Sequence, residues 1–256
     1  MSTQHTPLPD GPARAAAYNE AVRGRSPEAI LGWALAEFGH DGVALASSLG
    51  PEDQVLTEMF ARVTPTPRLF TLDTGRIFSE TYALMQQTMA AYGVRYEVAF
   101  PEASEVAALV REHGPNLFYE GRALRLACCE VRKVRPLRRI LTGLEAWLCG
   151  LRRDQSLTRT DTQVVAWDTE HHLFKVSPLA GWSEEAVWDY VRAHAVPTNA
   201  LHAVGMRSIG CAPCTRAVEP GEDVRAGRWW WEEPEHRECG LHSRHTSGPN
   251  PAKPNP

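Results

Sequence analysis

Hydrophobic and polar residues follow two alternating patterns along this chain. Short apolar runs are typical of buried parallel strands, and apolar stripes with helical spacing lie between them. Strands that alternate with helices predict an α/β fold, in which an open, mostly parallel sheet carries helices on both faces. The predicted strands are 42–46, 68–72, 95–100, 146–151, 164–167 and 173–176.

Helix signals separate these runs. Ser26 is a predicted N-cap for a helix over 27–38, and Ser183 caps a helix with acidic residues in its first turn. Between them, apolar stripes over 55–63 and 78–92 keep helical spacing and are expected to pack in the core. Ligands of such sheets bind at the C-terminal ends of the strands, so the loops there are the candidate sites.

Composition narrows the class of protein. The net charge of −4 gives no support for nucleic-acid binding. No apolar run approaches the ~18–20 residues of a membrane span, and the first residues lack a signal-peptide pattern. We therefore expect a cytoplasmic protein with no membrane partner. In that compartment, six cysteines favour metal binding or catalysis over disulfides.

Four of the cysteines form two close pairs, Cys128-Cys129 and Cys211-x-x-Cys214. Four thiolates around one centre suit zinc or an iron–sulfur cluster. Adjacent cysteines are an unusual way to hold one tetrahedral ion, which favours the cluster. A zinc site and a thioredoxin-type disulfide between Cys211 and Cys214 are the alternatives. Cys149 is expected to be a small core residue.

Cys239 differs from the paired cysteines. It lies in a polar segment between Arg237 and His242, with no other cysteine close by. Basic neighbours lower a thiol pKa and favour the nucleophilic thiolate. Cys239 is therefore a candidate nucleophile, and the alternative is an exposed thiol without a function.

Other polar residues suit an anionic ligand. Ser47 and Ser48 lie between a strand and a helix, where helix N-terminal amides bind phosphate, although an ordinary polar turn would have the same pattern. Arginines capture phosphate or sulfate oxygens in bidentate geometry, but each basic residue alone is typical of a solvated surface. The candidates are Lys133, Arg152, Arg153, Arg159, Arg225 and Arg228.

Ordered blocks between about residues 38 and 242 resemble the thiol-dependent adenylylsulfate reductases of bacterial and plant sulfate assimilation. They are residues 47–53 (SSLGPED), 72–76 (LDTGR), Cys128-Cys129 with Lys133, 152–156 (RRDQS), 211–216 (CAPCTR), 227–232 (GRWWWE) and 238–242 (ECGLH). Leu49 stands where an aromatic residue is usual in that family, and Pro51 is unusual beside it.

The resemblance implies a fold like that of the ATP-pyrophosphatase (PP-loop) enzymes and a role for each candidate residue. A [4Fe–4S] cluster would bind to Cys128, Cys129, Cys211 and Cys214, and Cys239 would be the nucleophile. Lys133, Arg225, Arg228 and His242 would meet the phosphosulfate, with Arg159 as a further substrate arginine. Ser47 and Ser48 belong to the phosphate loop, and Leu72 and Gly150 would cradle adenosine by backbone contacts.

The implied reaction reduces adenylylsulfate to sulfite and AMP through an S-sulfocysteine. An external dithiol, thioredoxin or a glutaredoxin-like donor, would release the sulfite, because the tail has no second cysteine. We expect a homo-oligomer. The predicted organisation is an N-terminal leader (1–25), an α/β domain for nucleotide and cluster (26–216), a C-terminal catalytic tail (217–245) and a disordered end (246–256).

Rival functions remain open from the sequence. A reductase of 3′-phosphoadenylylsulfate usually lacks both cysteine pairs, and Glu52 and Asp53 would repel an extra 3′-phosphate if they face it. A PP-loop enzyme that modifies RNA is disfavoured by the missing glycine-rich loop and the acidic net charge. A zinc-stabilised nucleotide sensor would be colourless and hold one zinc.

Overall fold

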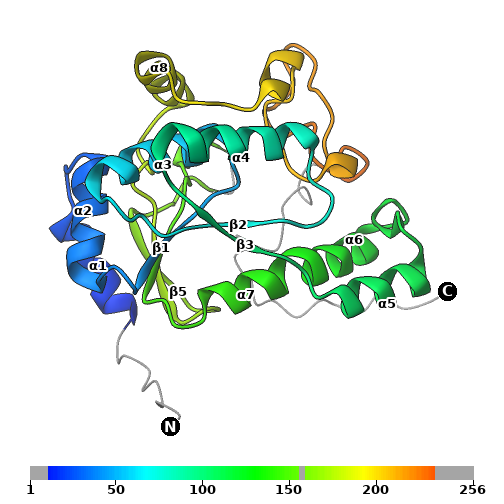
Figure 1. The fold of residues 1–256 in the computed structure, drawn as a ribbon, viewed down its shortest axis with the longest axis horizontal. Coiled ribbons are helices and arrows are strands. Elements are labelled where there is room, and N and C mark those ends of the chain that lie inside the picture. Colours follow the sequence, from blue (N-terminus) through cyan, green and yellow to red (C-terminus); the bar gives the residue numbers. More distant parts are fainter. Residues whose placement is uncertain (1–10, 156–158, 234–256) are drawn as a thin grey trace, which may run out of the picture.

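A six-stranded sheet with helices on both faces forms the part of the chain that the computed structural model describes, residues 11–155 and 159–233 (Figure 1). The sheet order is β3-β2-β1-β4-β6-β5, and only the β5–β6 pair is antiparallel. This arrangement confirms the predicted open, mostly parallel α/β fold. The strands are β1 (Val43–Ala46), β2 (Leu69–Leu72), β3 (Tyr96–Ala99), β4 (Ala146–Leu148), β5 (Val165–Asp168) and β6 (Leu173–Val176).

Helices α1 to α4 and α8 cover one face of the sheet, and α5 to α7 cover the other (Figure 1). The helices are α1 (Gly11–Ala21), α2 (Pro27–Phe38), α3 (Pro51–Val63), α4 (Ser79–Tyr92), α5 (Ala103–His113), α6 (Arg122–Cys129), α7 (Arg135–Leu141) and α8 (Glu184–His194). A π-helical turn, η2 (Glu130–Val134), joins α6 to α7 without a break. Pro136 explains the distortion, because it has no N–H to donate to the carbonyl of Arg132.

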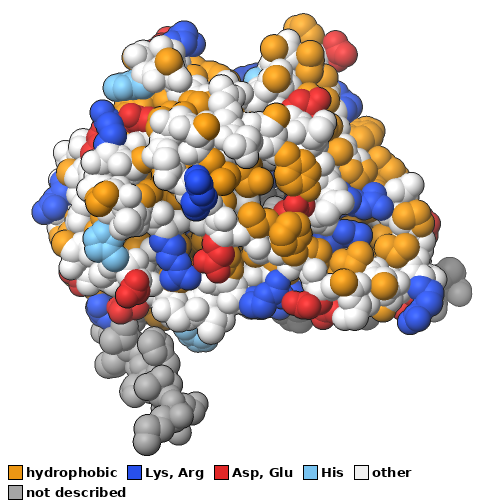
Figure 2. Space-filling view, viewed as in Figure 1, with side chains coloured by type: hydrophobic (Ala, Val, Ile, Leu, Met, Phe, Trp, Pro, Cys, Tyr) orange, Lys and Arg blue, Asp and Glu red, His pale blue; other side chains and the backbone are white. Residues whose placement is uncertain are grey.

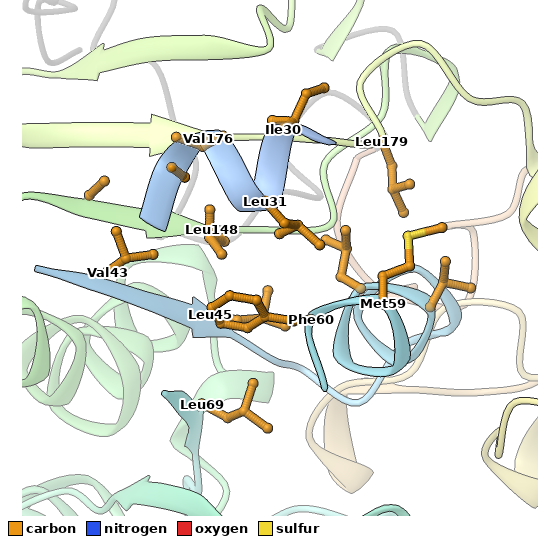
Figure 3. Close-up of a cluster of buried hydrophobic side chains, with 14 of the residues drawn as sticks. Ile30, Leu31, Val43, Leu45, Met59, Phe60, Leu69, Leu148, Val176 and Leu179 are labelled. Atoms are coloured by element: carbon orange, nitrogen blue, oxygen red, sulfur yellow. The ribbon is translucent and has the colours of Figure 1, made fainter. Parts of the chain in front are cut away.

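Each face of the sheet has its own hydrophobic core, because side chains alternate along a strand. Val43 and Leu45 of β1 belong to the core that residues of α2 and α3 also form, and Figure 3 shows them in one cluster with Leu31 and Phe60. Ala44, between them, belongs to the opposite core with Trp147 and residues of α7. The central strands are thus buried on both faces, which is why they are continuous apolar runs in the sequence.

Residues 11–21 form helix α1, although they lie within the predicted N-terminal leader. Gly11 packs directly on the indole of Trp167, leaving no room for a Cβ atom. The side-chain amide of Asn19 accepts from the N–H of Val165 at 3.0 Å and donates to its carbonyl at 2.6 Å. Helix α1 therefore binds edge strand β5 as a neighbouring strand would. It contributes Tyr18 to an aromatic cluster with Phe174.

The sheet has a switch point between β1 and β4, which are neighbours although far apart in the sequence. From β1 the chain winds outward to β2 and β3, and from β4 it winds the other way to β6. The loops after β1 and β4 leave in opposite directions there, and a crevice opens at the C-terminal ends of the strands. This is the place where the sequence predicted a ligand.

No helix among the described residues is long and apolar enough to cross a membrane. On the face of the molecule seen in Figure 2, basic and acidic side chains are interspersed.

Candidate active site

A pocket of about 300 Å³ opens at the switch point, a size that suits a small-molecule ligand. Its walls are the loops that follow β1, β2 and β4, the turn η2, and the segment 207–229. Every described residue that the sequence assigned to the substrate lies on these walls: Ser47, Ser48, Leu72, Lys133, Gly150, Arg159, Arg225 and Arg228. Cys239 and His242 lie outside the described residues, and their roles stay predictions.

The loop after β1 is a tight turn into α3. Leu49 has a left-handed backbone (φ 62°), which is uncommon for a residue with a Cβ, and its N–H donates to Oγ of Ser47 at 3.2 Å. Pro51 occupies the first turn of α3, where a backbone N–H has no helical partner. The structure therefore accommodates both residues that depart from the family pattern.

Asp53 ties this loop to the loop after β4. Its carboxylate accepts from the N–H and the hydroxyl of Ser48, both at 2.7 Å, and from the N–H of Gly150 at 3.1 Å. Burial raises the pKa of Asp53 to about 6, although the Ser48 donors act against it. A Cβ atom on Gly150 would lie 2.5 Å from this carboxylate, so glycine is required at that position.

Glu52 is paired rather than free to face a ligand. Its Oε1 accepts from Nε and Nη2 of Arg152, at 2.9 and 2.8 Å. The oxygens of Asp53 are likewise taken up by donors. Both side chains line the pocket, so the predicted repulsion of a 3′-phosphate stays a prediction, although the pairing with Arg152 offsets the charge of Glu52.

The basic residues of the pocket come from three separate segments. Lys133 lies on η2, and Arg159 follows η3 (Arg153–Gln155). Arg225 and Arg228 lie in the segment 207–229. Nη1 of Arg159 donates to Oε1 of Gln155 at 2.6 Å. The guanidinium of Arg228 occupies the space where a side chain on Gly210 would be. These cations can neutralise an anionic ligand from several sides.

The four paired cysteines line a second, smaller cavity. Cys128 and Cys129 end α6, Cys211 is the N-cap of the short helix η6 (Ala212–Cys214), and Cys214 is its last residue. All four are buried free thiols, so the disulfide between Cys211 and Cys214 is not formed. Their cavity has basic walls, which suit thiolates: Arg76, Arg125, Arg132 and Lys133.

The environments of the thiols differ. Burial would raise the pKa of Cys211, but Lys133, the hydroxyl of Thr74 at 3.2 Å and the neighbouring arginines together lower it below its ordinary value. Burial and the charge of Cys211 raise the pKa of Cys214 to about 12. Four thiols in one cationic cavity are a donor set for a cluster. Across residues 11–155 and 159–233, no three His, Cys, Asp or Glu side chains are arranged to hold one metal ion.

The two cavities share a wall. Lys133, Cys211 and Trp229 border both the thiol cavity and the larger pocket. Lys133, which lies on the turn that continues the helix of the first cysteine pair, therefore places its positive charge at the wall of the larger pocket. A group bound by the thiols would act on the pocket electrostatically across this wall.

Some pocket residues carried no signal in the sequence. Trp147 and Trp188 belong to apolar stretches of a strand and a helix, yet both reach the pocket. Nδ1 of His202 lies 2.9 Å from the carbonyl of Met206, and its buried Nε2 has no partner among the described residues. Cys149 is buried as expected, but it also borders the pocket beside Ser177. Their tertiary positions, not their local patterns, place these residues at the site.

Comparisons with known proteins agree with this geometry. Residues 42–217 match the model of the phosphoadenosine phosphosulfate reductase domain. An adenosine 5′-phosphosulfate reductase of Allochromatium vinosum is 51% identical over 204 residues, 80% of each chain. A phosphoadenylyl-sulfate reductase of Candida auris, solved with phosphate, superposes with a TM-score of 0.68 at 26% identity, over 83% of this chain and 97% of that one. An FMN adenylyltransferase of Candida glabrata shares the fold alone, with a TM-score of 0.53 at 10% identity, over 92% and 79% of the two chains.

Proposed function

The chain belongs to the phosphoadenosine phosphosulfate reductase family, and we propose that it reduces adenylylsulfate to sulfite and AMP in assimilatory sulfate reduction. Two cavities that share a wall carry this proposal, because a nucleotide-sized pocket with several cations directly adjoins four buried thiols. The relative from Allochromatium vinosum, which is 51% identical in sequence and is named for the same activity, supports the choice of substrate.

In the first half-reaction, the thiolate of Cys239 attacks the sulfur of adenylylsulfate. A bond forms between the two sulfur atoms, and the bond from the sulfonyl sulfur to the bridging oxygen breaks. The electron pair leaves with AMP. Lys133, Arg225 and Arg228 line the pocket and would stabilise the negative charge that develops on the phosphate. Their positions on separate segments would fix the phosphosulfate while the sulfur is attacked.

In the second half-reaction, a thiolate of thioredoxin, or of a glutaredoxin-like donor, attacks the sulfur of Cys239. The sulfur–sulfur bond to the sulfonate breaks and sulfite leaves with the electron pair. A mixed disulfide remains, and the second thiol of the donor resolves it. The donor is oxidised to a disulfide and Cys239 returns as a free thiol, so the two electrons that reduce the sulfonyl sulfur come from the donor.

We also propose that Cys128, Cys129, Cys211 and Cys214 hold a [4Fe–4S] cluster. The four thiols and the cationic walls of their cavity support it, because such clusters are bound by thiolates and carry negative charge. When bound, the cluster would supply a structural centre and an electrostatic field next to Lys133. The protein itself provides the substrate contacts, since the pocket-lining cations come from its own side chains.

Withholding the reductant tests the mechanism, because covalent catalysis then leaves an isolable intermediate. Incubation with adenylylsulfate alone should release about one AMP per chain and add the mass of one sulfonate to Cys239. Thioredoxin should then remove the added mass and release sulfite. Cys239→Ser should still bind nucleotide and form no adduct. An adduct on another cysteine, or sulfite production by Cys239→Ser, would instead favour direct attack by the external thiol.

Reduction of 3′-phosphoadenylylsulfate is the second candidate. The pairing of Glu52 with Arg152 favours it, since the arginine offsets part of the carboxylate repulsion expected from the sequence. The related Candida auris structure is also named for that substrate. Turnover of the two substrates by the same preparation distinguishes the candidates, and a preference for the 3′-phosphorylated form would overturn our assignment.

A further inference from the structure

Arg125 and Glu232 form a buried ion pair beside the thiol cavity. Their side chains are 1% and 6% exposed, and the contact is bidentate, with Nη2–Oε2 at 2.6 Å and Nε–Oε1 at 2.9 Å. Arg125 belongs to α6, the helix that ends in the first cysteine pair. Glu232 lies near the end of the last described segment, so the pair joins distant parts of the chain.

Arg125 and Glu232 both contact Trp229. The guanidinium carbon of Arg125 lies 4.7 Å from the centre of the indole, and the N–H of Glu232 donates to the carbonyl of Trp229 at 2.8 Å. Trp229 is 1% exposed and has a left-handed backbone (φ 43°). Such a conformation persists only where its surroundings enforce it, and the ion pair is part of those surroundings.

Trp229 in turn supports Arg228 in the larger pocket. The guanidinium carbon of Arg228 lies 4.7 Å from the centre of the indole, and its Nε donates to the carbonyl of Cys214 at 3.4 Å. The backbone of Arg228 pairs with Thr215. The position of this substrate-side arginine therefore depends on an indole that the ion pair holds.

We propose that Arg125 and Glu232 are positioning residues for Arg228. Arg125 borders the thiol cavity, neither residue lines the larger pocket, and they fix Trp229 so that the guanidinium of Arg228 is aimed at the phosphosulfate. The inference rests on the proposed function, in which Arg228 binds that group. By this inference, the position of Arg228 depends on α6, the helix that ends in the first cysteine pair.

The chemistry of the pair fits positioning better than stability. Removing two charges from water costs so much that hydrophobic residues of similar volume often stabilise a protein as well as a buried ion pair does. The planar fork of arginine fixes direction as well as distance to a carboxylate. A lysine at position 125 would keep the charge and lose both the fork and the guanidinium above the indole.

A double-mutant cycle tests the coupling. All variants carry Cys239→Ser, so that bound adenylylsulfate is not consumed, and Kd is measured by calorimetry. Glu232→Gln and Arg125→Lys should each weaken adenylylsulfate binding about tenfold, by loss of an oriented charge-assisted contact. In the Arg228→Ala background, Glu232→Gln should add less than about a twofold change, because its effect passes through Arg228.

Glu58→Gln is the matched control, because it removes a nearly buried carboxylate of α3 that pairs with Arg62 and does not line the pocket. It should leave Kd unchanged. If the losses from Glu232→Gln and Arg228→Ala multiply, the pair affects binding independently of Arg228 and the inference is wrong.

Failure of the proposed function would look different. Adenylylsulfate would then bind the Cys239→Ser parent no better than adenosine does. A crystal structure of Glu232→Gln would still decide the inference, which requires the Arg228 guanidinium to leave its place over Gly210. An unmoved guanidinium would overturn it.

Discussion

Glu52 and Arg152 form a salt bridge across the switch point, with Nη2 of Arg152 2.8 Å from Oε1 of Glu52. Glu52 belongs to the first turn of α3, and Arg152 follows β4. The arginine side chain is 5% exposed and the glutamate 16%, so water screens the pair only partly. The loops after the two neighbouring strands are thus held together by opposite charges, and neither charge is free for a ligand.

Glu52→Gln should shift nucleotide preference towards 3′-phosphorylated ligands. The substitution removes the nearer carboxylate partner of Arg152 and leaves Asp154 at 3.6 Å, so more of the positive charge is available to a second phosphate. We expect the affinity for adenosine 3′,5′-bisphosphate to rise about tenfold relative to AMP, measured as a ratio of Kd values. The exposed Glu20→Gln on α1 serves as the control. An unchanged ratio would show that Arg152 cannot reach the ligand.

Bound iron should depend on the four paired cysteines and not on Cys149. Serine at 128, 129, 211 or 214 removes a thiol from the shared cavity, and each variant should lose the brown colour and most of the iron. Cys149→Ser alters a thiol of the other cavity, beside Ser177, and should retain iron. Iron analysis of anaerobically purified protein measures this. Colourless wild-type protein with one zinc would contradict the cluster.

Gly210→Ala should weaken substrate binding with little effect on folding. The added methyl group would overlap the guanidinium of Arg228 and displace it from the pocket. We expect Kd for adenylylsulfate to rise roughly tenfold, the loss of one charge-assisted contact. Gly32→Ala is the matched control, because its nearest neighbour, Cγ1 of Val63, is 3.9 Å away. That variant should bind normally and gain roughly 0.5–1 kcal/mol of helix stability.

Asp53 should give the protein a pH-dependent stability. Burial raises its pKa from the ordinary 3.8 to about 6, so the folded chain holds this proton more tightly than the unfolded chain. The protonated carboxyl raises the free energy of unfolding. This contribution is fully present below about pH 4 and is lost as pH rises through about 6. Between roughly pH 5 and 7.5 the loss is about 1.4 kcal/mol.

Asp53→Asn removes this titration. The wild type should therefore lose about 1.4 kcal/mol more than the variant over the same pH range, whatever the variant's overall loss from broken contacts with Ser48. Urea unfolding at several pH values provides the comparison. Equal slopes for the two proteins would mean that the raised pKa of Asp53 is wrong.

Local patterns in the sequence determined the strands, the class of fold and the candidate residues. The apolar run 42–46 predicted β1 because a strand buried on both faces needs hydrophobic residues at every position. The serine loop after it predicted a ligand site because βα loops of a parallel sheet meet at one edge. The cysteine pairs indicated a shared site through the chemistry of thiolates alone.

Tertiary structure decided what those residues do to one another. A sequence pattern reports neighbours along the chain, whereas ion pairs and cavity walls depend on how distant segments pack. The pairing of Glu52 with Arg152, which no local pattern indicated, offsets the charge from which a repulsion of a 3′-phosphate was expected. Residues 11–21 form a helix packed against β5, within the stretch 1–25 that the sequence predicted as a leader. Lys133, Cys211 and Trp229 form the wall between the two cavities. That wall exists only because η2 and the segment 207–229 meet beside the sheet.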